Sequence, residues 1–173
     1  MAKTPIHVRV SQHGTSFTMH LRMILKAPRA RVWHVLTDYR EIGKLNPAVK
    51  RARVTRKAGV TLLRMHIKSC VLFLCFPVNQ AETMTTRPRR VIEGTIVARL
   101  SSFRSGFARW TLTPVAGGTQ ADFVSTLTPR FYIPPILGPW LLRAKIGSEM
   151  RRTARHLATW VGAKTRRRAS ARG

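Results

Sequence analysis

The residues that could carry out acid–base or metal chemistry are few, and their spacing fits no familiar arrangement for it. The six histidines are His7, His13, His20, His34, His66 and His156. None of them forms an HxxxH or HExxH pair, the spacings that place two zinc ligands on one helix face. We therefore predict neither a metal site nor a bound cofactor. Side chains alternate between the two faces of a strand, and this alternation predicts that His20 and His66 face solvent. For His156 we favour ordinary packing against the helix stripe.

Carboxylates are equally scarce: Asp38, Glu41, Glu82, Glu93, Asp122 and Glu149. We expect Glu82, Glu93 and Asp122 to pair with neighbouring arginines within strands. The helical residue Glu149 can pair with Lys145 or Arg152, four and three positions away. No Ser-His-Asp order, GxSxG turn or phosphate loop is present. The sequence predicts no catalytic residues, and a protein that is not an enzyme is favoured.

Both cysteines, Cys70 and Cys75, lie in the apolar run CVLFLCFPV. Five residues apart on one extended strand, their side chains would point to opposite faces and could not easily be bridged. We therefore interpret them as buried free thiols, which behave as small apolar side chains.

Charge is the most unusual property of the chain, since 32 Lys and Arg face six Asp and Glu, for a net charge of +26. Such a field attracts polyanions, and two interpretations stay open: a solvated basic surface, which is favoured, or contact with RNA, the ribosome or an anionic membrane. The apolar run at 70–78 is shorter than the roughly 20 residues that span a bilayer. The N-terminus lacks the apolar core of a signal peptide. We expect a cytoplasmic protein, with peripheral membrane contact as an alternative.

Most of the chain has the pattern of antiparallel strands. In residues 17–26, apolar Phe17, Met19 and Leu21 alternate with polar side chains, as in a strand with one buried face. Gly117-Gly118 predicts a hairpin. The expected strands are 5–11, 17–26, 49–57, 60–75, 78–86, 90–98, 106–114 and 119–128.

Three helices complete the predicted fold: 29–37, 39–45 and a long one that starts at 135 or 138 and ends near 162. Apolar residues recur along the last at spacings of three or four: Ile136, Trp140, Ala144, Gly147, Met150, Ala154, Leu157 and Val161. This pattern predicts an amphipathic helix that lies on an apolar surface. We expect one domain, 1–163, followed by a basic disordered tail, 164–173.

The order of these elements predicts an α+β fold, in which a curved antiparallel sheet wraps around the long C-terminal helix. Two short helices follow the first strands. Layers that curve apart leave an apolar hollow, the usual site for a small molecule. The predicted lining residues are Met65, Ile67, Trp110, Leu112, Phe123, Phe131, Trp140, Ala144, Met150 and Leu157.

Three segments resemble a known family, the START-like superfamily in its polyketide cyclase/dehydrase and coenzyme Q-binding branch. They are APRARVWHVLTDYREIGKLNP (27–47), FRSGFARWTLTPVAGGTQADF (103–123) and PRFYIPPILGPWLL (129–142). The resemblance implies a helix-grip fold with a hydrophobic cavity. It also implies ligands such as polyprenyl quinones, lipids or polyketides.

Our first hypothesis is therefore a carrier or chaperone that holds a hydrophobic small molecule in an internal cavity. The second is a cyclase or dehydratase, which requires an inward-facing titratable pair; His156, Glu93 and Arg109 are its candidates. The third is a START-like protein that contacts RNA or the ribosome through its basic surface.

Overall fold

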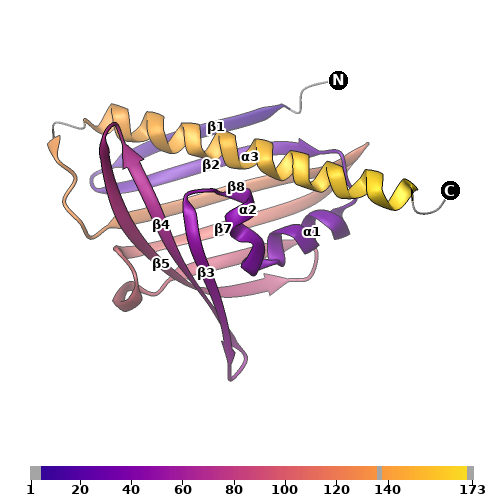
Figure 1. Cartoon of the computed structure of the whole chain (residues 1–173), viewed down its shortest axis with the longest axis horizontal. Coiled ribbons are helices and arrows are strands. Elements are labelled where there is room, and N and C mark those ends of the chain that lie inside the picture. The colour runs from indigo at the N-terminus through magenta and orange to yellow at the C-terminus, as the bar shows by residue number, and fades with distance from the viewer. Residues whose placement is uncertain (1–4, 136–137, 171–173) are drawn as a thin grey trace.

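A computed structural model describes residues 5–135 and 138–170 of the chain, with side chains to residue 162. Eight strands and three α-helices follow one another, with two short 3₁₀ turns between them (Figure 1). In chain order they are β1 (Ile6–His13), β2 (Ser16–Leu25), α1 (Arg29–Thr37), η1 (Tyr39–Glu41), α2 (Ile42–Leu45), β3 (Val49–Lys57), β4 (Val60–Val71), β5 (Leu74–Arg87), β6 (Val91–Ile96), η2 (Ala98–Leu100), β7 (Phe103–Val115), β8 (Gly118–Pro129) and α3 (Pro139–Ser170).

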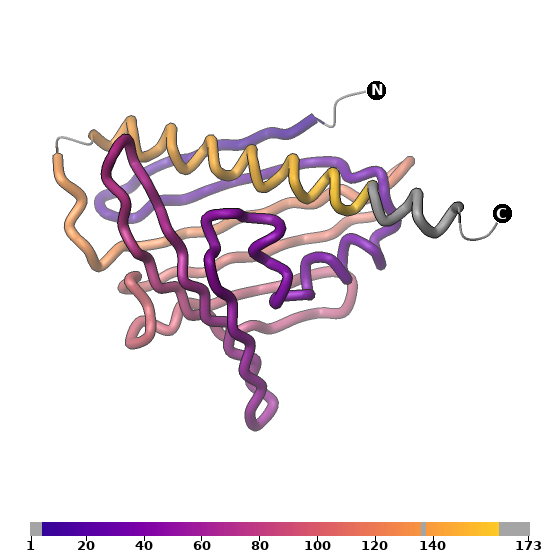
Figure 2. The backbone as a smooth tube through the Cα atoms, in the orientation of Figure 1, coloured from indigo at the N-terminus to yellow at the C-terminus, as the bar shows by residue number. Residues whose placement is uncertain are grey.

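All strands belong to one antiparallel sheet in the order β1-β2-β8-β7-β6-β5-β4-β3. The sheet curls, so that β5, β4 and β3 cross in front of the other strands, on the side where α3 lies (Figure 2). This arrangement is the predicted α+β helix-grip fold.

The predicted alternation in β2 is confirmed by its burial. Phe17, Met19, Leu21, Met23 and Leu25 are all buried on the concave face. The predicted Gly-Gly hairpin joins β7 to β8, and Gly117 there has a φ of +78°. Glycine adopts this left-handed conformation without steric cost.

The helix α3 rests on the concave side of the sheet, against β1 and β2, and also contacts α1 and α2. Its buried residues Ala154, Leu157 and Val161 join the largest core cluster, together with Leu21 and Met23 of β2. No helix in the described part of the chain is long and apolar enough to cross a bilayer.

The cysteine prediction was wrong. Cys70 and Cys75 form a disulfide, because β4 and β5 meet in a tight hairpin that places the two residues directly opposite each other. The turn consists of Leu72 and Phe73, and Leu72 has a φ of +55°. The predicted strand 60–75 therefore ends at Val71, and neither cysteine is fully buried.

The prediction that the long helix ends near 162 was wrong, because α3 continues to Ser170. The side chains of the predicted tail, 164–173, lie outside the described part of the structure, as does Ile136 of the helical stripe. The domain boundary at 163 stays a prediction.

The two ends of the α3 stripe differ in burial. We therefore expect that replacing a side chain by alanine changes the stability of the protein differently at each end. Leu157 is 1% exposed and Trp140 is 67% exposed. Leu157→Ala should lower the free energy of unfolding by about 2–5 kcal/mol, because it leaves a cavity in the core. Trp140→Ala should change it by no more than about 0.5 kcal/mol. Urea unfolding of both variants checks this, and equal losses would contradict the packing described for α3.

Candidate ligand-binding site

The C-terminal half of α3 leaves little room above the sheet, because side chains fill the interior there. Of the predicted cavity residues, Leu112 and Leu157 are almost fully buried in the main core cluster, and Met150 packs against it. Trp110 and Phe123 lie on adjacent strands, with ring centroids 4.7 Å apart. These residues form the floor of the interior, and whether they touch a ligand stays a prediction.

Two further predicted residues, Met65 and Ile67, belong to the other half of the interior. Met65 is buried in a second cluster with Tyr39, Val49, Leu63 and Ile92, and Ile67 packs on this cluster from its edge. Trp110 contacts both clusters, so the two form one continuous interior.

The remaining predicted residues, Phe131, Trp140 and Ala144, are exposed. Phe131 makes an edge-on contact with Phe103, at 6.2 Å between ring centroids. The stripe of α3 is thus covered by protein from Gly147 onward but not at its start.

An apolar pocket of about 400 Å³ opens beside Phe131. Its walls come from β5, from the loop between η2 and β7 and from the segment that follows β8: Phe76, Pro77, Val78, Ser102, Arg130, Phe131 and Tyr132. Val78 is itself buried with Ile96 and Phe103 in a small cluster. Ile67 packs against both this cluster and the one around Met65, so the pocket borders that half of the interior.

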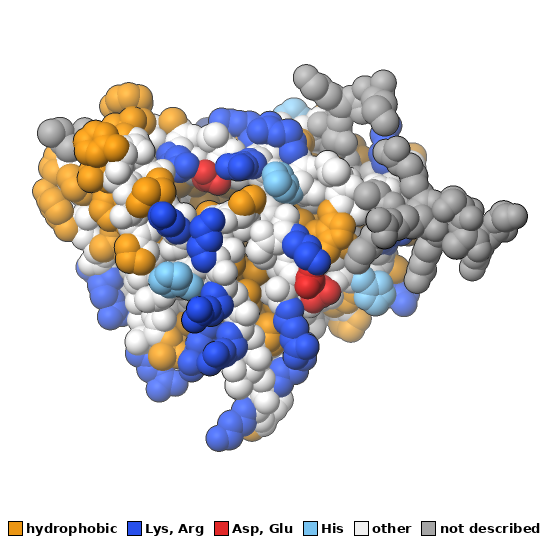
Figure 3. Space-filling model, viewed as in Figure 1, with side chains coloured by type: hydrophobic (Ala, Val, Ile, Leu, Met, Phe, Trp, Pro, Cys, Tyr) orange, Lys and Arg blue, Asp and Glu red, His pale blue; other side chains and the backbone are white. Residues whose placement is uncertain are grey.

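Exposed apolar side chains gather at this end of the molecule, over the β4–β5 hairpin and the start of α3 (Figure 3). We call this surface the apolar end, and it consists of Leu72, Phe73, Leu74, Phe76, Phe131, Tyr132 and Trp140. Phe73, at the hairpin tip, is 87% exposed. Clustered exposure of this kind marks a binding surface, because isolated apolar residues are common on proteins but large patches are not.

The interior also contains a carboxyl group, which corrects the prediction that Glu82 pairs with an arginine. Glu82 is 4% exposed, and the only hydrogen bond described for its side chain comes from Gln80 Nε2, at 2.8 Å. Burial raises the pKa of the Glu82 carboxyl, and the hydrogen bond from Gln80 offsets only part of this rise. Burial therefore makes this carboxyl easier to protonate than an exposed one.

A second polar group, the Tyr39 hydroxyl, is buried in the same half of the interior. Its oxygen has no hydrogen-bond partner among the described residues. Burial raises the pKa of Tyr39; the charge of Arg56 opposes the rise and that of Glu82 adds to it. An unsatisfied buried hydroxyl costs about 1–3 kcal/mol, so this position needs an explanation.

Three other carboxylates, Glu93, Asp122 and Glu149, form the ion pairs that the sequence predicts. Glu93 pairs with Arg109 on the outer face of the sheet, and Asp122 pairs with Arg22 at 2.5 Å. Glu149 accepts a bond from Lys145 at 2.6 Å. Because Glu93 and Arg109 bind each other and are partly exposed, the inward-facing pair proposed for an enzyme does not come from them.

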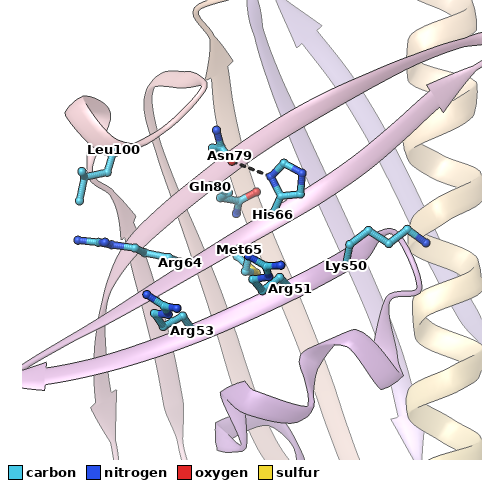
Figure 4. A pocket seen from close by; sticks show the side chains of 9 residues that line it. All are labelled: Lys50, Arg51, Arg53, Arg64, Met65, His66, Asn79, Gln80 and Leu100. Carbon is cyan, nitrogen blue, oxygen red and sulfur yellow. Dashed lines mark hydrogen bonds between the residues drawn. The ribbon is translucent and has the colours of Figure 1, made fainter.

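A second pocket, of about 540 Å³, is strongly basic and lies over β3, β4 and β5 (Figure 4). It is lined by Lys50, Arg51, Arg53, Arg64, Met65, His66, Asn79, Gln80 and Leu100. His66 is exposed, as predicted, and shares a hydrogen bond with Asn79 at 2.9 Å. No carboxylate lines this pocket, so it could hold an anion but offers little to a hydrophobic molecule.

Comparison with known families identifies the chain. The family described as "Polyketide cyclase / dehydrase and lipid transport" matches residues 16–162, nearly the whole domain. The chain belongs to this family. Membership and fold together confirm the START-like assignment. Comparison with curated proteins finds no match.

Solved structures with the same fold support this placement. The Zhui aromatase/cyclase from Streptomyces sp. R1128 is 17% identical, with 91% of this chain and 98% of that chain covered and a TM-score of 0.64. The STAR-related lipid transfer protein from Xanthomonas axonopodis is 16% identical, with coverages of 90% and 92% and a TM-score of 0.67. The di-domain ARO/CYC StfQ of the steffimycin biosynthetic pathway is 13% identical, with a TM-score of 0.67; the match covers 87% of this chain and 52% of StfQ.

The sequence did not lead us to predict Glu82, Tyr39 or Phe76 as residues of the candidate ligand-binding site. A signal for Glu82 was present, because Val78 and Met84 share its strand parity and are apolar. That parity places Glu82 on the inner face. No comparable signal existed for Tyr39, whose position depends on the fold of η1 against β3.

The raised pKa of Glu82 predicts that the natural chain and a Glu82→Gln variant differ in stability by an amount that depends on pH. A carboxyl whose pKa is higher in the folded than in the unfolded state costs stability as pH rises above the unfolded value. Glu82→Gln removes this cost, so the variant should gain stability over the natural chain at pH 8, and the gain should shrink toward pH 4. Chemical denaturation across this range measures it, with Glu93→Gln as the exposed control. A Glu82→Gln difference that is the same at every pH would contradict the assignment.

Proposed function

We propose that the protein binds a hydrophobic small molecule, such as a polyprenyl quinone, a lipid or a polyketide-like compound, as a carrier or chaperone. The molecule enters at the apolar end and lies between the start of α3 and the concave face. The observation that carries this proposal is the aromatic pocket of about 400 Å³ at the apolar end. Its volume falls within the roughly 300–1,000 Å³ of small-molecule sites.

The uneven burial of α3 supports the same location. Ala154 and Leu157 are covered by the sheet, whereas Trp140 and Ala144, on the same stripe, are exposed. A ligand at the apolar end would cover apolar surface that the protein itself leaves open. Each Å² of apolar surface that the ligand removes from water contributes about 25 cal/mol to the binding free energy.

Family membership supports the ligand class, since the family description names both polyketide cyclases and lipid transport. A carrier is favoured over an enzyme, because Glu93 and Arg109 pair on the outer face. A cyclase or dehydratase would have to depend on Glu82, the carboxyl on the inner face, or on His156, which is half-buried on α3.

Membrane contact is part of the proposal, because the apolar end is bordered by basic side chains. Lys68, Arg130 and Arg143 are exposed beside it. Aromatic residues insert at the interface of a bilayer, and each nearby Lys or Arg contributes about 1 kcal/mol on an anionic surface. A carrier that docks by this end would present its pocket to the lipid phase.

The pocket proposal predicts a difference between two equally exposed phenylalanines. Phe131 lines the pocket at 44% exposure, and Phe107 lies on β7 outside it at 45%. Phe131→Ala should weaken binding of the uncharged probe N-phenyl-1-naphthylamine about tenfold, through lost apolar contact. Phe107→Ala should leave it unchanged. Fluorescence titration measures both affinities. Equal effects of the two substitutions would show that the probe does not bind in this pocket.

The membrane proposal predicts that the hairpin tip controls vesicle binding. A Leu72→Ser/Phe73→Ser double variant should lose cosedimentation with phosphatidylcholine vesicles containing phosphatidylglycerol, because it removes the two exposed apolar side chains at the tip of the hairpin. Val60→Ser, at the tip of the β3–β4 hairpin and 52% exposed, is the control and should bind normally. Binding should also weaken as salt screens the lipid charge. If the double variant still binds these vesicles, or if RNA displaces the protein from them, the basic surface and not the apolar end mediates contact.

A further inference from the structure

Glu82 lies on the inner face of the sheet, in line with the apolar pocket. Val78, Gln80 and Glu82 alternate along β5 on this face, and Val78 lines the pocket. Four residues of strand span about 13 Å. A ligand whose apolar body occupies the pocket therefore reaches Glu82 if it extends inward by this length.

The surroundings of Glu82 are those of a neutral hydrogen-bonding group. The chain carries 32 Lys and Arg, yet no ion pair with Glu82 is present in the described structure. Gln80 donates to Oε1, and no hydrogen bond is described for Oε2, which can carry the proton when the carboxyl is neutral. Oε2 lies over Gly94, where a Cβ would come within 2.7 Å of it, so this glycine makes room for the carboxyl.

Tyr39 supplies a second hydroxyl to the same region. It packs in one cluster with Leu63, Met65 and Ile92, and Leu63 is the direct cross-strand partner of Glu82. The Tyr39 hydroxyl has no partner within the described structure. Two hydroxyl groups that can donate thus lie in an otherwise apolar part of the interior.

We propose that Glu82 and Tyr39 form a polar subsite that binds a carbonyl oxygen of the hydrophobic ligand, as found in a quinone or ketone. The inference rests on the proposed function, since it concerns the inner end of the same ligand. Both groups donate hydrogen bonds to an acceptor, which a plain hydrocarbon lacks. A site built to hydrogen-bond its ligand discriminates against analogues without the matching group. The subsite therefore selects carbonyl compounds among molecules of similar shape.

Two probes with the same carbon skeleton test this selection, each with a decyl chain long enough to occupy the pocket while its ring lies at Glu82: 2-decyl-3-methyl-1,4-naphthoquinone and 2-decyl-3-methylnaphthalene. Equilibrium dialysis with the full chain should show tighter binding of the quinone by about tenfold or more, the value of one to two hydrogen bonds. Tyr39→Phe and Glu82→Leu should each reduce this preference about three- to tenfold and leave hydrocarbon binding unchanged. Glu93→Leu, which removes a carboxyl from the outer face of the sheet, should keep the full preference.

The outcomes separate the two proposals. If both probes bind but the natural chain shows no preference, or if Tyr39→Phe retains it, the subsite is wrong and the hydrophobic site stands. If neither probe binds, the proposed function fails and the subsite fails with it. Thermal unfolding of Glu82→Leu verifies that the variant is folded, and Tyr39→Phe provides the test should it not be.

Discussion

The packing of α3 on the concave face is the constraint on which the rest of the structure depends. Ala154, Leu157 and Val161 anchor the second half of the helix against β1 and β2, where the largest core cluster forms. The sheet curls around this contact, so its far strands enclose a second interior region. Because the anchor lies at one end of the helix, apolar surface near Trp140 is left uncovered at the other.

Function follows from this asymmetry. The end with the anchored helix is packed and supplies stability, whereas the opposite end carries the aromatic pocket and the hairpin closed by Cys70 and Cys75. Between them lies a region that combines apolar walls with the hydroxyl of Tyr39 and the carboxyl of Glu82. Small-molecule sites typically combine an apolar cavity with a few polar groups that orient the ligand.

Much of the fold could be predicted from the sequence, because alternation and helical periodicity report directly on which face is buried. The strand at 17–26 and the turn at Gly117 are examples. The Leu72-Phe73 turn could not be predicted, since neither residue favours a turn and the run around it reads as one strand. That error concealed the disulfide. Periodicity also predicted the stripe on α3 but not how far the sheet covers it, which depends on the partner surface. The arginine partner predicted for Glu82 was wrong, because the alternation of side chains along β5 places this carboxyl on the inner face.

Native mass spectrometry of the protein, purified without detergent, tests directly whether it holds a hydrophobic ligand. We expect a fraction of the molecules to carry one added mass, which organic solvent releases as a hydrophobic compound. A bare polypeptide mass, unchanged after incubation with lipid extract or with uncharged hydrophobic compounds, would contradict the account.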